Sequence, residues 1–301
     1  MSEPIHWLVV GARGQLGSAL AEALRPSARP TQLTLAGRAE LDLGSARAGE
    51  QLREWAHSRG HGPLVVLNAA AWTDVDGAEA DPDGASAVNE RGPALLAAEC
   101  ARLDATLIQV STDYVFPGVA SQPYEVHDPV GPATVYGATK EAGERAVRAV
   151  LARHYIVRTA WLYGAGGGNF VRTIAALRHR RATMEVVDDQ RGSPTWTADL
   201  AEGLVALARS AAPYGTYHCA GAGEASWYEL ARAVFEEVGA DPGRVRPCGS
   251  DRFPRPAPRP SYSVLSGRSW EAAGLPAQPR WRDALRSAFR VHRSALDTPH
   301  G

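Results

Sequence analysis

One pair of residues in this sequence has the types and spacing of an acid–base centre. Tyr136 and Lys140 lie four positions apart, so a helix would place both side chains on one face. Lys140 is the only lysine among the 32 lysines and arginines of the chain. A phenol with a pKa near ~10 is a poor acid–base at neutral pH, but a neighbouring ammonium moves that pKa towards neutrality. The pair therefore predicts proton transfer to or from a substrate; the alternative is an ordinary surface lysine.

A second set of polar residues follows an apolar run at 106–110, where we expect a strand. Ser111, Thr112 and Asp113 come directly after it. The carboxyl ends of parallel strands are where such sheets bind ligands. Thr112 is therefore predicted to hydrogen-bond a substrate carbonyl oxygen and the Tyr136 hydroxyl, which makes Thr112, Tyr136 and Lys140 the expected catalytic set.

A glycine-rich turn near the N-terminus predicts a dinucleotide site. Strand residues 7–10 are followed by glycines in the spacing G-x-x-G-x-x-G and then by a helical pattern. Such glycines allow a tight turn, a close approach of backbone to pyrophosphate, and close packing of helix on strand. The pyrophosphate would lie at the helix N-terminus; a turn with no ligand is the alternative. The expected contacts are Gly11, Arg13, Gly14, Gln15, Leu16 and Gly17, with Tyr136 and Lys140 at the nicotinamide ribose.

The end of the second predicted strand bears on the choice of cofactor. NAD sites usually carry an acidic residue there, but this strand ends in Gly37 and Arg38. Arg38 and Arg13 both suit a 2′-phosphate, so we predict NADPH. NADH is the alternative if both are ordinary surface arginines. By position, Asp42 and its neighbour Leu43 are expected beside the adenine.

Apolar runs and helical patterns alternate through the first half of the chain. The runs are continuous, which is typical of strands covered on both faces. The predicted fold class is α/β, a doubly wound parallel Rossmann sheet with a smaller C-terminal substrate-binding lobe. We assign residues 1–160 to the dinucleotide-binding domain, with later strands near 184–188 and 215–219 added, and most of 161–301 to the lobe. Strands are expected at 7–10, 32–36, 64–68, 106–110, 155–158, 184–187 and 215–219, and helices at 15–24, 46–59, 93–103, 137–151, 170–180, 198–208, 227–238 and 281–292.

Composition and charge exclude several classes of protein. The 301 residues carry a formal net charge of −1, so no basic field recruits nucleic acid or anionic lipid. The N-terminus has no basic leader, and its apolar run is too short for a membrane span. Three distant cysteines match neither a disulfide framework nor a zinc site. We therefore predict a cytoplasmic protein with buried structural thiols and no metal.

Several strings, in order along nearly the whole chain, carry a family signature. They are residues 11–17, 68–71, 111–116, 136–140, 158–163, 169–170, 189–195 and 259–260, of which Ser-Thr-Asp-Tyr-Val-Phe at 111–116 is fairly specific. Together they resemble the dTDP-4-dehydrorhamnose reductase family of extended short-chain dehydrogenases. The resemblance implies a dTDP-4-keto-6-deoxyhexose substrate with hydride delivered to C4, and it implies that Thr112, Tyr136 and Lys140 are catalytic. It implies further cofactor contacts at Ala69, Ala70 and Ala71, and substrate contacts at Trp72, Thr73, Asp113, Tyr114, Trp161, Asn169, Gln190 and Arg259.

Some of these substrate contacts also have a plainer interpretation. Arg259, in the proline-rich stretch 251–260, suits a substrate pyrophosphate, but a rigid linker would explain the stretch. Gln190 would face the nucleotide, although the Gly-Ser-Pro turn after it is sufficient reason for that sequence. Asp74 and Asp76 would either bind sugar hydroxyls or cap the following helix.

The sequence also departs from the family pattern. Enterobacterial members hold a magnesium ion at a dimer interface with glutamates, whereas Ala19 and Ala198 stand at the corresponding places. We therefore predict a monomer or weak homodimer without that metal. Trp72 near the sugar would retune the substrate towards another 4-keto-deoxysugar.

Three functions compete. The first is reduction of dTDP-4-dehydrorhamnose to dTDP-L-rhamnose, or of a related dTDP-4-keto-deoxysugar of secondary metabolism, as in dTDP-dihydrostreptose synthesis. The second, a dehydratase or epimerase, is disfavoured because similar dehydratases have Asp-Glu where this chain has Asp113-Tyr114. The third is a non-enzymatic NADP-binding subunit, as in methionine adenosyltransferase, which the complete set of Thr112, Tyr136 and Lys140 disfavours.

Overall fold

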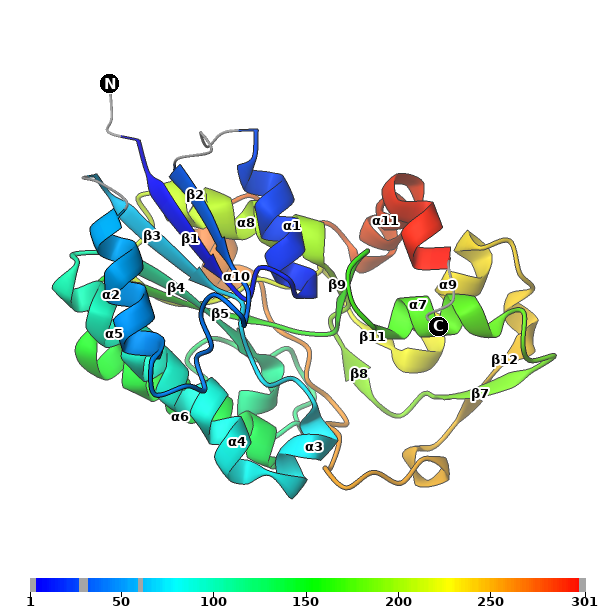
Figure 1. The fold of residues 1–301 in the computed structure, drawn as a ribbon. Coiled ribbons are helices and arrows are strands. Elements are labelled where there is room, and N and C mark those ends of the chain that lie inside the picture. Colours follow the sequence, from blue (N-terminus) through cyan, green and yellow to red (C-terminus); the bar gives the residue numbers. More distant parts are fainter. Residues whose placement is uncertain (1–3, 27–31, 59–61, 298–301) are drawn as a thin grey trace.

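A sheet of six parallel strands forms the centre of the computed structural model, which describes residues 4–26, 32–58 and 62–297 (Figure 1). Its strands are β1 (His6–Val10), β2 (Leu33–Ala36), β3 (Leu64–Asn68), β4 (Thr106–Thr112), β5 (His154–Thr159) and β10 (Gly215–His218). They lie in the order β10-β5-β4-β3-β1-β2. Because β1 lies between β2 and β3, the strand order reverses there. This is the switch point at which doubly wound sheets bind ligands.

Helices cover both faces of this sheet (Figure 1). One face carries α1 (Gln15–Leu24), α8 (Thr197–Arg209) and α10 (Arg268–Ala272), and the other carries α2 (Ala48–Ser58), α5 (Gly92–Arg102) and α6 (Val135–Val150). The strands feed a separate core on each side: Trp7 and Val9 pack in one, Leu8 and Val10 in the other. Burial on both faces explains the continuous apolar runs, and the predicted doubly wound α/β fold is confirmed.

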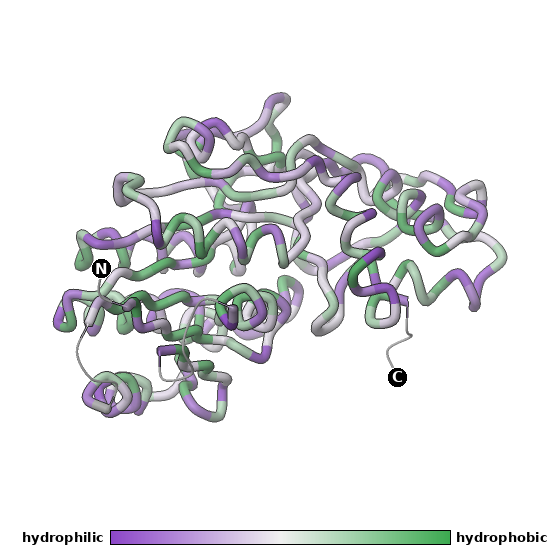
Figure 2. Tube along the Cα trace, turned by 90° about the horizontal axis from the view of Figure 1, so that it is seen from above, coloured by the Kyte–Doolittle hydropathy of each residue, from purple (hydrophilic) through white to green (hydrophobic). Residues whose placement is uncertain are grey.

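A smaller lobe is built mostly from residues after β5. It contains α7 (Phe170–Leu177), α9 (Trp227–Glu237) and α11 (Trp281–Asp297), with the strand pairs β7 (Met184–Val187) with β12 (Val245–Cys248), β8 (Arg191–Gly192) with β11 (Ala225–Ser226), and β6 (Leu162–Tyr163) with β9 (Thr195–Trp196). Val171, Leu230 and Phe289 belong to its core. Figure 2 shows hydrophobic and hydrophilic stretches alternating along the helices, as expected where one helix face is buried.

One of the two later strands predicted for the main sheet is not in it. β10 pairs with β5 in parallel, as predicted for 215–219. β7 pairs with β12 in a separate ladder, so the placement of 184–188 in the sheet is wrong. The physical reason is that Met184 and Val186 turn into the core of the lobe. Since α8, β10 and α10 all return to the sheet, a division at residue 160 stays a proposal.

The segment between β3 and α5 folds into short elements that periodicity does not predict. They are α3 (Val75–Ala80), α4 (Pro82–Ser86) and a π-helical turn at Ala87–Arg91. Asp74 caps α3 by accepting a hydrogen bond from the Gly77 N–H, which confirms the capping interpretation for Asp74. In the described parts of the chain, no helix has the length and apolar character needed to cross a membrane.

Candidate active site

The glycine turn joins β1 to α1 at the switch point of the sheet. Gly11 has φ +79°, and a Cβ there would lie 2.6 Å from the Ala70 backbone nitrogen. A Cβ on Gly17 would lie 2.1 Å from the Gly11 carbonyl oxygen. Gly14 is the N-cap of α1 and makes no side-chain cap. The turn therefore brings the Ala69–Ala71 run at the end of β3 against Gly11, and the first N–H groups of α1 suit a phosphate.

Arg13 and Arg38 are each paired with a carboxylate. Arg13 Nη2 lies 2.6 Å from Glu40 Oε1, and Arg38 Nε lies 3.2 Å from Asp42 Oδ2. Glu40 also accepts a hydrogen bond from the Gly37 N–H at 2.8 Å. The arginine side chains are 74% and 84% exposed, so these pairs are weak enough to exchange for another anion. Sequence reasoning placed Asp42 at the adenine and missed Glu40, because only the folded turn brings it to Arg13.

Three of the predicted cofactor contacts have their side chains engaged elsewhere. Leu16 and Leu43 are 5% and 7% exposed and lie in the cores on opposite faces of the sheet, so only their backbones suit a cofactor. The Gln15 amide reaches the lobe: it accepts a hydrogen bond from Asn169 Nδ2 at 3.0 Å and donates one to the Gly168 carbonyl at 3.1 Å. Gln15 therefore ties the phosphate-binding turn to the loop before α7.

The three predicted catalytic residues come from neighbouring elements at the carboxyl edge of the sheet. Thr112 is the last residue of β4, two residues beyond the predicted strand end, and Tyr136 and Lys140 lie on the first turns of α6. A Cβ on Gly137 would lie 2.2 Å from the Tyr114 carbonyl oxygen. Glycine thus lets α6 begin against the turn that follows β4, which brings Tyr136 within hydrogen-bonding reach of Thr112.

Lys140 is a buried lysine fixed at a strand end. It is 4% exposed, and its Nζ donates a hydrogen bond to the Val110 carbonyl at 2.7 Å. Burial lowers the pKa of Lys140 to about 8, against the opposing charge of Glu144. Lysine is almost never fully buried unless it is paired, and a side chain that is 4% exposed is not on the surface, so the alternative of an ordinary surface lysine is wrong.

The pKa of Tyr136 moves in the direction opposite to the expectation from sequence. Burial raises it to about 12, a hydrogen bond with Thr112 opposes the rise, and the charge of Asp113 adds to it. The prediction that the Lys140 ammonium brings this pKa towards neutrality is therefore wrong for this structure, because the amine is bound at the Val110 carbonyl. A phenol that stays protonated at neutral pH suits a proton donor.

Asp113, one of the predicted substrate contacts, is buried beside Thr112. It is 2% exposed, and the Thr112 hydroxyl donates a hydrogen bond to its Oδ1 at 3.0 Å. Burial raises the pKa of Asp113 to about 6, against hydrogen bonds from Ser263 and Thr112. The carboxyl thus orients the Thr112 hydroxyl from inside the protein, and a direct contact between Asp113 and the substrate stays a prediction.

A cleft of about 760 Å³ opens beside these residues, and it contains four of the predicted substrate contacts. Tyr114, Trp161, Gln190 and Arg259 all line it. The ring of Tyr114 meets the ring of Tyr136 edge to face, with centroids 5.4 Å apart. This contact places Tyr136 directly behind Tyr114, a residue of the cleft wall.

Trp161 forms an aromatic wall of the cleft in a strained conformation. Its φ is +47°, a region that bulky residues rarely adopt. Its indole stacks on Trp227 with a centroid distance of 3.4 Å and an interplanar angle of 3°. A Cβ on Gly192 would lie 2.3 Å from the Trp161 ring, so glycine is required on that side. Trp227 and Gly192 therefore hold Trp161 in place.

Three other predicted substrate contacts are not among the residues that line the cleft. Asn169 caps α7 and hydrogen-bonds the phosphate-binding turn. Trp72 packs against a small cluster that contains Tyr136, and its indole N–H donates to a backbone carbonyl. Thr73 is exposed. Conversely, sequence reasoning missed the cleft residues Trp227, Phe253 and Arg255, whose local patterns indicate only a helix start and a proline-rich loop.

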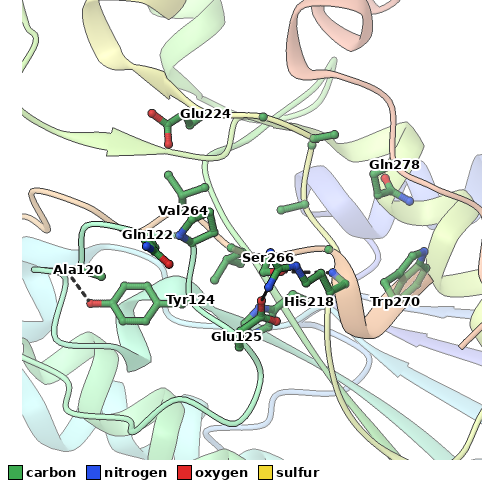
Figure 3. A pocket seen from close by; sticks show the side chains of 18 of the residues that line it. Ala120, Gln122, Tyr124, Glu125, His218, Glu224, Val264, Ser266, Trp270 and Gln278 are labelled. Atoms are coloured by element: carbon green, nitrogen blue, oxygen red, sulfur yellow. Dashed lines mark hydrogen bonds and ion pairs between the residues drawn. The ribbon is translucent and has the colours of Figure 1, made fainter. Parts of the chain in front are cut away.

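A second cavity, of about 720 Å³, shares no lining residue with the cleft and contains no predicted site residue (Figure 3). His218, Trp270 and Tyr124 line it, and Figure 3 shows the Tyr124 hydroxyl directed at the backbone of Ala120. Burial, followed by the charge of Arg158, lowers the pKa of His218 to about 3. Among the residues that the structure describes, no three His, Cys, Asp or Glu side chains are grouped to hold a metal ion.

A doubly wound sheet, a glycine turn at its switch point and a buried Thr-Tyr-Lys set beside a cleft define an oxidoreductase of the extended short-chain dehydrogenase/reductase class. The sequence model of the RmlD substrate binding domain family matches residues 5–293, and the chain belongs to that family. It is 50% identical over 289 residues to dTDP-4-dehydrorhamnose reductase of Streptomyces griseus, covering 94% of this chain and 93% of that one. The resemblance inferred from sequence motifs is confirmed.

Two further relatives bear on cofactor and substrate. The dTDP-4-dehydrorhamnose reductase of Bacillus anthracis, solved in complex with NADP, superposes with a TM-score of 0.87 at 33% identity, covering 97% of this chain and 100% of that one. A probable dTDP-4,6-dihydroxy-2-methyloxan-3-one 4-ketoreductase of Streptomyces antibioticus is 44% identical over 287 residues, 95% of each chain.

Proposed function

We propose that the protein reduces the C4 keto group of a dTDP-4-keto-6-deoxyhexose with NADPH, converting dTDP-4-dehydrorhamnose to dTDP-L-rhamnose. The observation that carries the proposal is the buried set of Thr112, Tyr136 and Lys140 beside a cleft of about 760 Å³. Clefts of this size hold ligands as large as nucleotide sugars. The name of the Streptomyces griseus relative, which matches nearly the whole chain, supports this substrate.

The residues of the glycine turn fit the diphosphate of a dinucleotide. Side chains at Gly11 and Gly17 would fill the space into which the backbone folds, and the N-terminus of α1 follows directly. NADPH, when bound there, supplies hydride to the substrate carbonyl carbon. Arg13 and Arg38 would exchange their carboxylate partners for the 2′-phosphate. The NADP complex of the Bacillus anthracis relative supports this choice of cofactor over NADH.

The protein supplies the proton that the carbonyl oxygen needs. Tyr136 donates its phenolic proton to that oxygen, and the pKa of about 12 keeps the donor protonated at neutral pH. The Thr112 hydroxyl, which donates to Asp113 before the substrate binds, turns its single proton to the same oxygen as negative charge develops there. Lys140, fixed at the Val110 carbonyl, would hold the nicotinamide ribose.

The cleft would hold the nucleotide sugar by three kinds of contact. Trp161 presents a flat aromatic wall to the sugar, next to Tyr114. Arg259 and Arg255 offer guanidinium groups to the diphosphate. Gln190, fixed by hydrogen bonds with neighbouring side chains, lies where it can face the nucleotide.

The test is NADPH oxidation by purified protein with a small panel of dTDP-4-keto-sugars. Tyr136→Phe should lower kcat at least about 10²-fold, as expected on removing a general acid, with the Kd of NADPH unchanged. Tyr214→Phe, a change at a tyrosine that is 45% exposed, serves as the control and should leave kcat unaltered. A Tyr136→Phe variant that reduces these sugars as fast as the parent would contradict the proposal.

A second candidate is a reductase for a related dTDP-4-keto-deoxysugar of secondary metabolism, such as the precursor of dTDP-dihydrostreptose. The name of the Streptomyces antibioticus relative favours it. NMR of the products from the same panel decides between the two sugars and fixes the C4 stereochemistry. Water loss from dTDP-glucose would indicate a dehydratase, and a stoichiometric partner without turnover would indicate a regulatory subunit. A cytoplasmic location and a monomer or weak homodimer stay predictions.

A further inference from the structure

Helix α3 lies between the acid–base centre and the proline-rich stretch 251–260, and a carboxylate contacts each. On one side, Glu79 Oε1 accepts a hydrogen bond from the Val135 N–H at 2.8 Å, one residue before Tyr136. On the other side, Asp76 contacts the proline-rich stretch, which supplies Phe253, Arg255, Arg259 and Pro260 to the cleft. The short helix therefore joins the start of α6 to one wall of the substrate cleft.

Asp76 is the centre of a closed set of contacts with that wall. Arg259 Nη2 donates to Asp76 Oδ2 at 2.8 Å, and the Ala257 N–H donates to Asp76 Oδ1 at 3.2 Å. Arg259 Nη1 then donates to the Ala257 carbonyl at 2.9 Å, which closes the ring. Arg255 Nη1 lies 3.9 Å from Asp76 Oδ2. Two residues of the proline-rich stretch are thus fixed to one carboxylate at both of its oxygens.

The burial and charge of this set indicate a defined geometry. The side chains of Asp76 and Arg259 are only 25% and 24% exposed, and Ala257 is 1% exposed. Burial raises the pKa of Asp76, but the bonds from Arg259 and Ala257 outweigh it and hold the pKa below its ordinary value. The carboxylate therefore stays ionised. The prolines on either side of Ala257 restrict the backbone, so holding this stretch at Asp76 costs less backbone conformational entropy.

We propose that Asp76 is a positioning residue for the substrate diphosphate. It fixes the Arg259 guanidinium and the proline-rich stretch at the cleft wall, so that Arg259 is already oriented when the nucleotide sugar arrives. This inference rests on the proposed function, in which Arg259 binds the diphosphate. It replaces the interpretation in which Asp76 binds sugar hydroxyls directly, because both carboxylate oxygens are already engaged with the chain.

The test is a double-mutant cycle over Asp76 and Arg259. Asp76→Asn should raise the KM for the dTDP-keto-sugar about tenfold, which corresponds to about 1.4 kcal/mol, with kcat and the KM for NADPH little changed. Asp76→Glu, which keeps the carboxylate, should recover part of the loss. Because Asp76 acts through Arg259, the Asp76→Asn/Arg259→Ala double variant should be no worse than Arg259→Ala alone. Arg252→Ala, at an exposed ion pair of the same stretch, is the matched control and should change neither constant.

Two results would overturn the inference. One is additivity of the two substitutions, which would mean that Asp76 meets the substrate independently of Arg259. The other is a fall in kcat with an unchanged KM for the sugar, which would indicate a general structural role. Calorimetric binding of dTDP alone separates this inference from the proposed function. If no keto-sugar is reduced but the effects of the Asp76 and Arg259 substitutions on dTDP binding are not additive, the proposed function fails and the positioning role stands. If keto-sugars are reduced and the two substitutions are additive both in KM and in dTDP binding, the positioning role fails.

Discussion

Replacing the buried carboxyl of Asp113 with an amide should stabilise the protein at neutral pH while it impairs the reaction. Asp113 is 2% exposed and its pKa is raised from 3.8 to about 6, chiefly by burial. A raised carboxyl pKa means that the folded protein binds the proton more tightly than the unfolded chain does. The ionised form therefore costs stability, and Asp113→Asn removes that cost.

The magnitude follows from the size of the shift. A change from 3.8 to about 6 is roughly two pKa units, and each unit is worth about 1.4 kcal/mol, so the ionised carboxyl costs about 3 kcal/mol above pH 7. The amide oxygen can still accept a hydrogen bond from the Thr112 hydroxyl, but a neutral acceptor binds it less strongly. This loss offsets about 1 kcal/mol of the stability gained. The net gain for Asp113→Asn is about 2 kcal/mol at neutral pH.

The pH dependence identifies the cause. Between the two pKa values the folded protein holds more protons at this site than the unfolded chain, so the contribution of Asp113 to stability falls as pH rises. The free energy of unfolding of Asp113→Asn minus that of the parent should grow by about 2 kcal/mol between pH 4.5 and 8. Urea unfolding followed by tryptophan fluorescence at several pH values measures it. Taking the difference removes the other titrating groups.

Activity supplies the second readout. A difference in the free energy of unfolding that does not vary with pH would refute the reasoning. Asp113→Asn should lower kcat, because the Thr112 hydroxyl loses its ionised acceptor, and should leave NADPH binding unaltered. If the stability difference does not change with pH, the pKa of the Asp113 carboxyl is not raised in the folded protein. If the variant is less stable at every pH, its hydrogen bonds outweigh the cost of burying the charge.

Three further outcomes are expected. Gly17→Ala should weaken NADPH binding at least about tenfold by calorimetry, because the new Cβ would lie 2.1 Å from a backbone oxygen, whereas Gly168→Ala, with no atom within 4 Å of its Cβ, should not. Gly192→Ala should raise the KM for the keto-sugar and spare that for NADPH, because the methyl group displaces Trp161. His218→Gln should show a stability advantage that grows as pH falls below about 6.5, since burial lowers the histidine pKa to about 3, and a pH-independent difference would contradict this.

Much of the fold could be predicted because its signals are local. The strands of the main sheet are continuous apolar runs, and β3 and α1 have the bounds that the sequence predicts. The pairing of β7 with β12 could not be predicted, because it depends on a core shared by distant segments of the lobe. The short helix α3 could not be predicted either, because glycine interrupts its apolar spacing.

The candidate site divides in the same way. The sequence predicts Tyr136 and Lys140 because one helix fixes their spacing. It predicts Thr112 because the residue at the end of a parallel strand lies at the carboxyl edge of the sheet. The pKa of Tyr136 was predicted in the wrong direction, because burial and the Val110 carbonyl decide it and neither is visible in the spacing. Trp227 could not be found, because its role depends on a face-to-face contact across the lobe.

Three positions that break ordinary folding rules lie at the proposed site, and their grouping is itself an argument for it. Lys140 is a buried lysine, Asp113 is a buried carboxyl with a raised pKa, and Trp161 is a bulky residue with φ +47°. Each costs stability, and proteins keep such costs where function requires them. Asp104, the other described non-glycine residue with positive φ, does not bear on function, because aspartate tolerates that conformation in an exposed turn. The strain at Trp161 is held by its stacking on Trp227 and by the missing side chain of Gly192, and Trp161 itself lines the cleft.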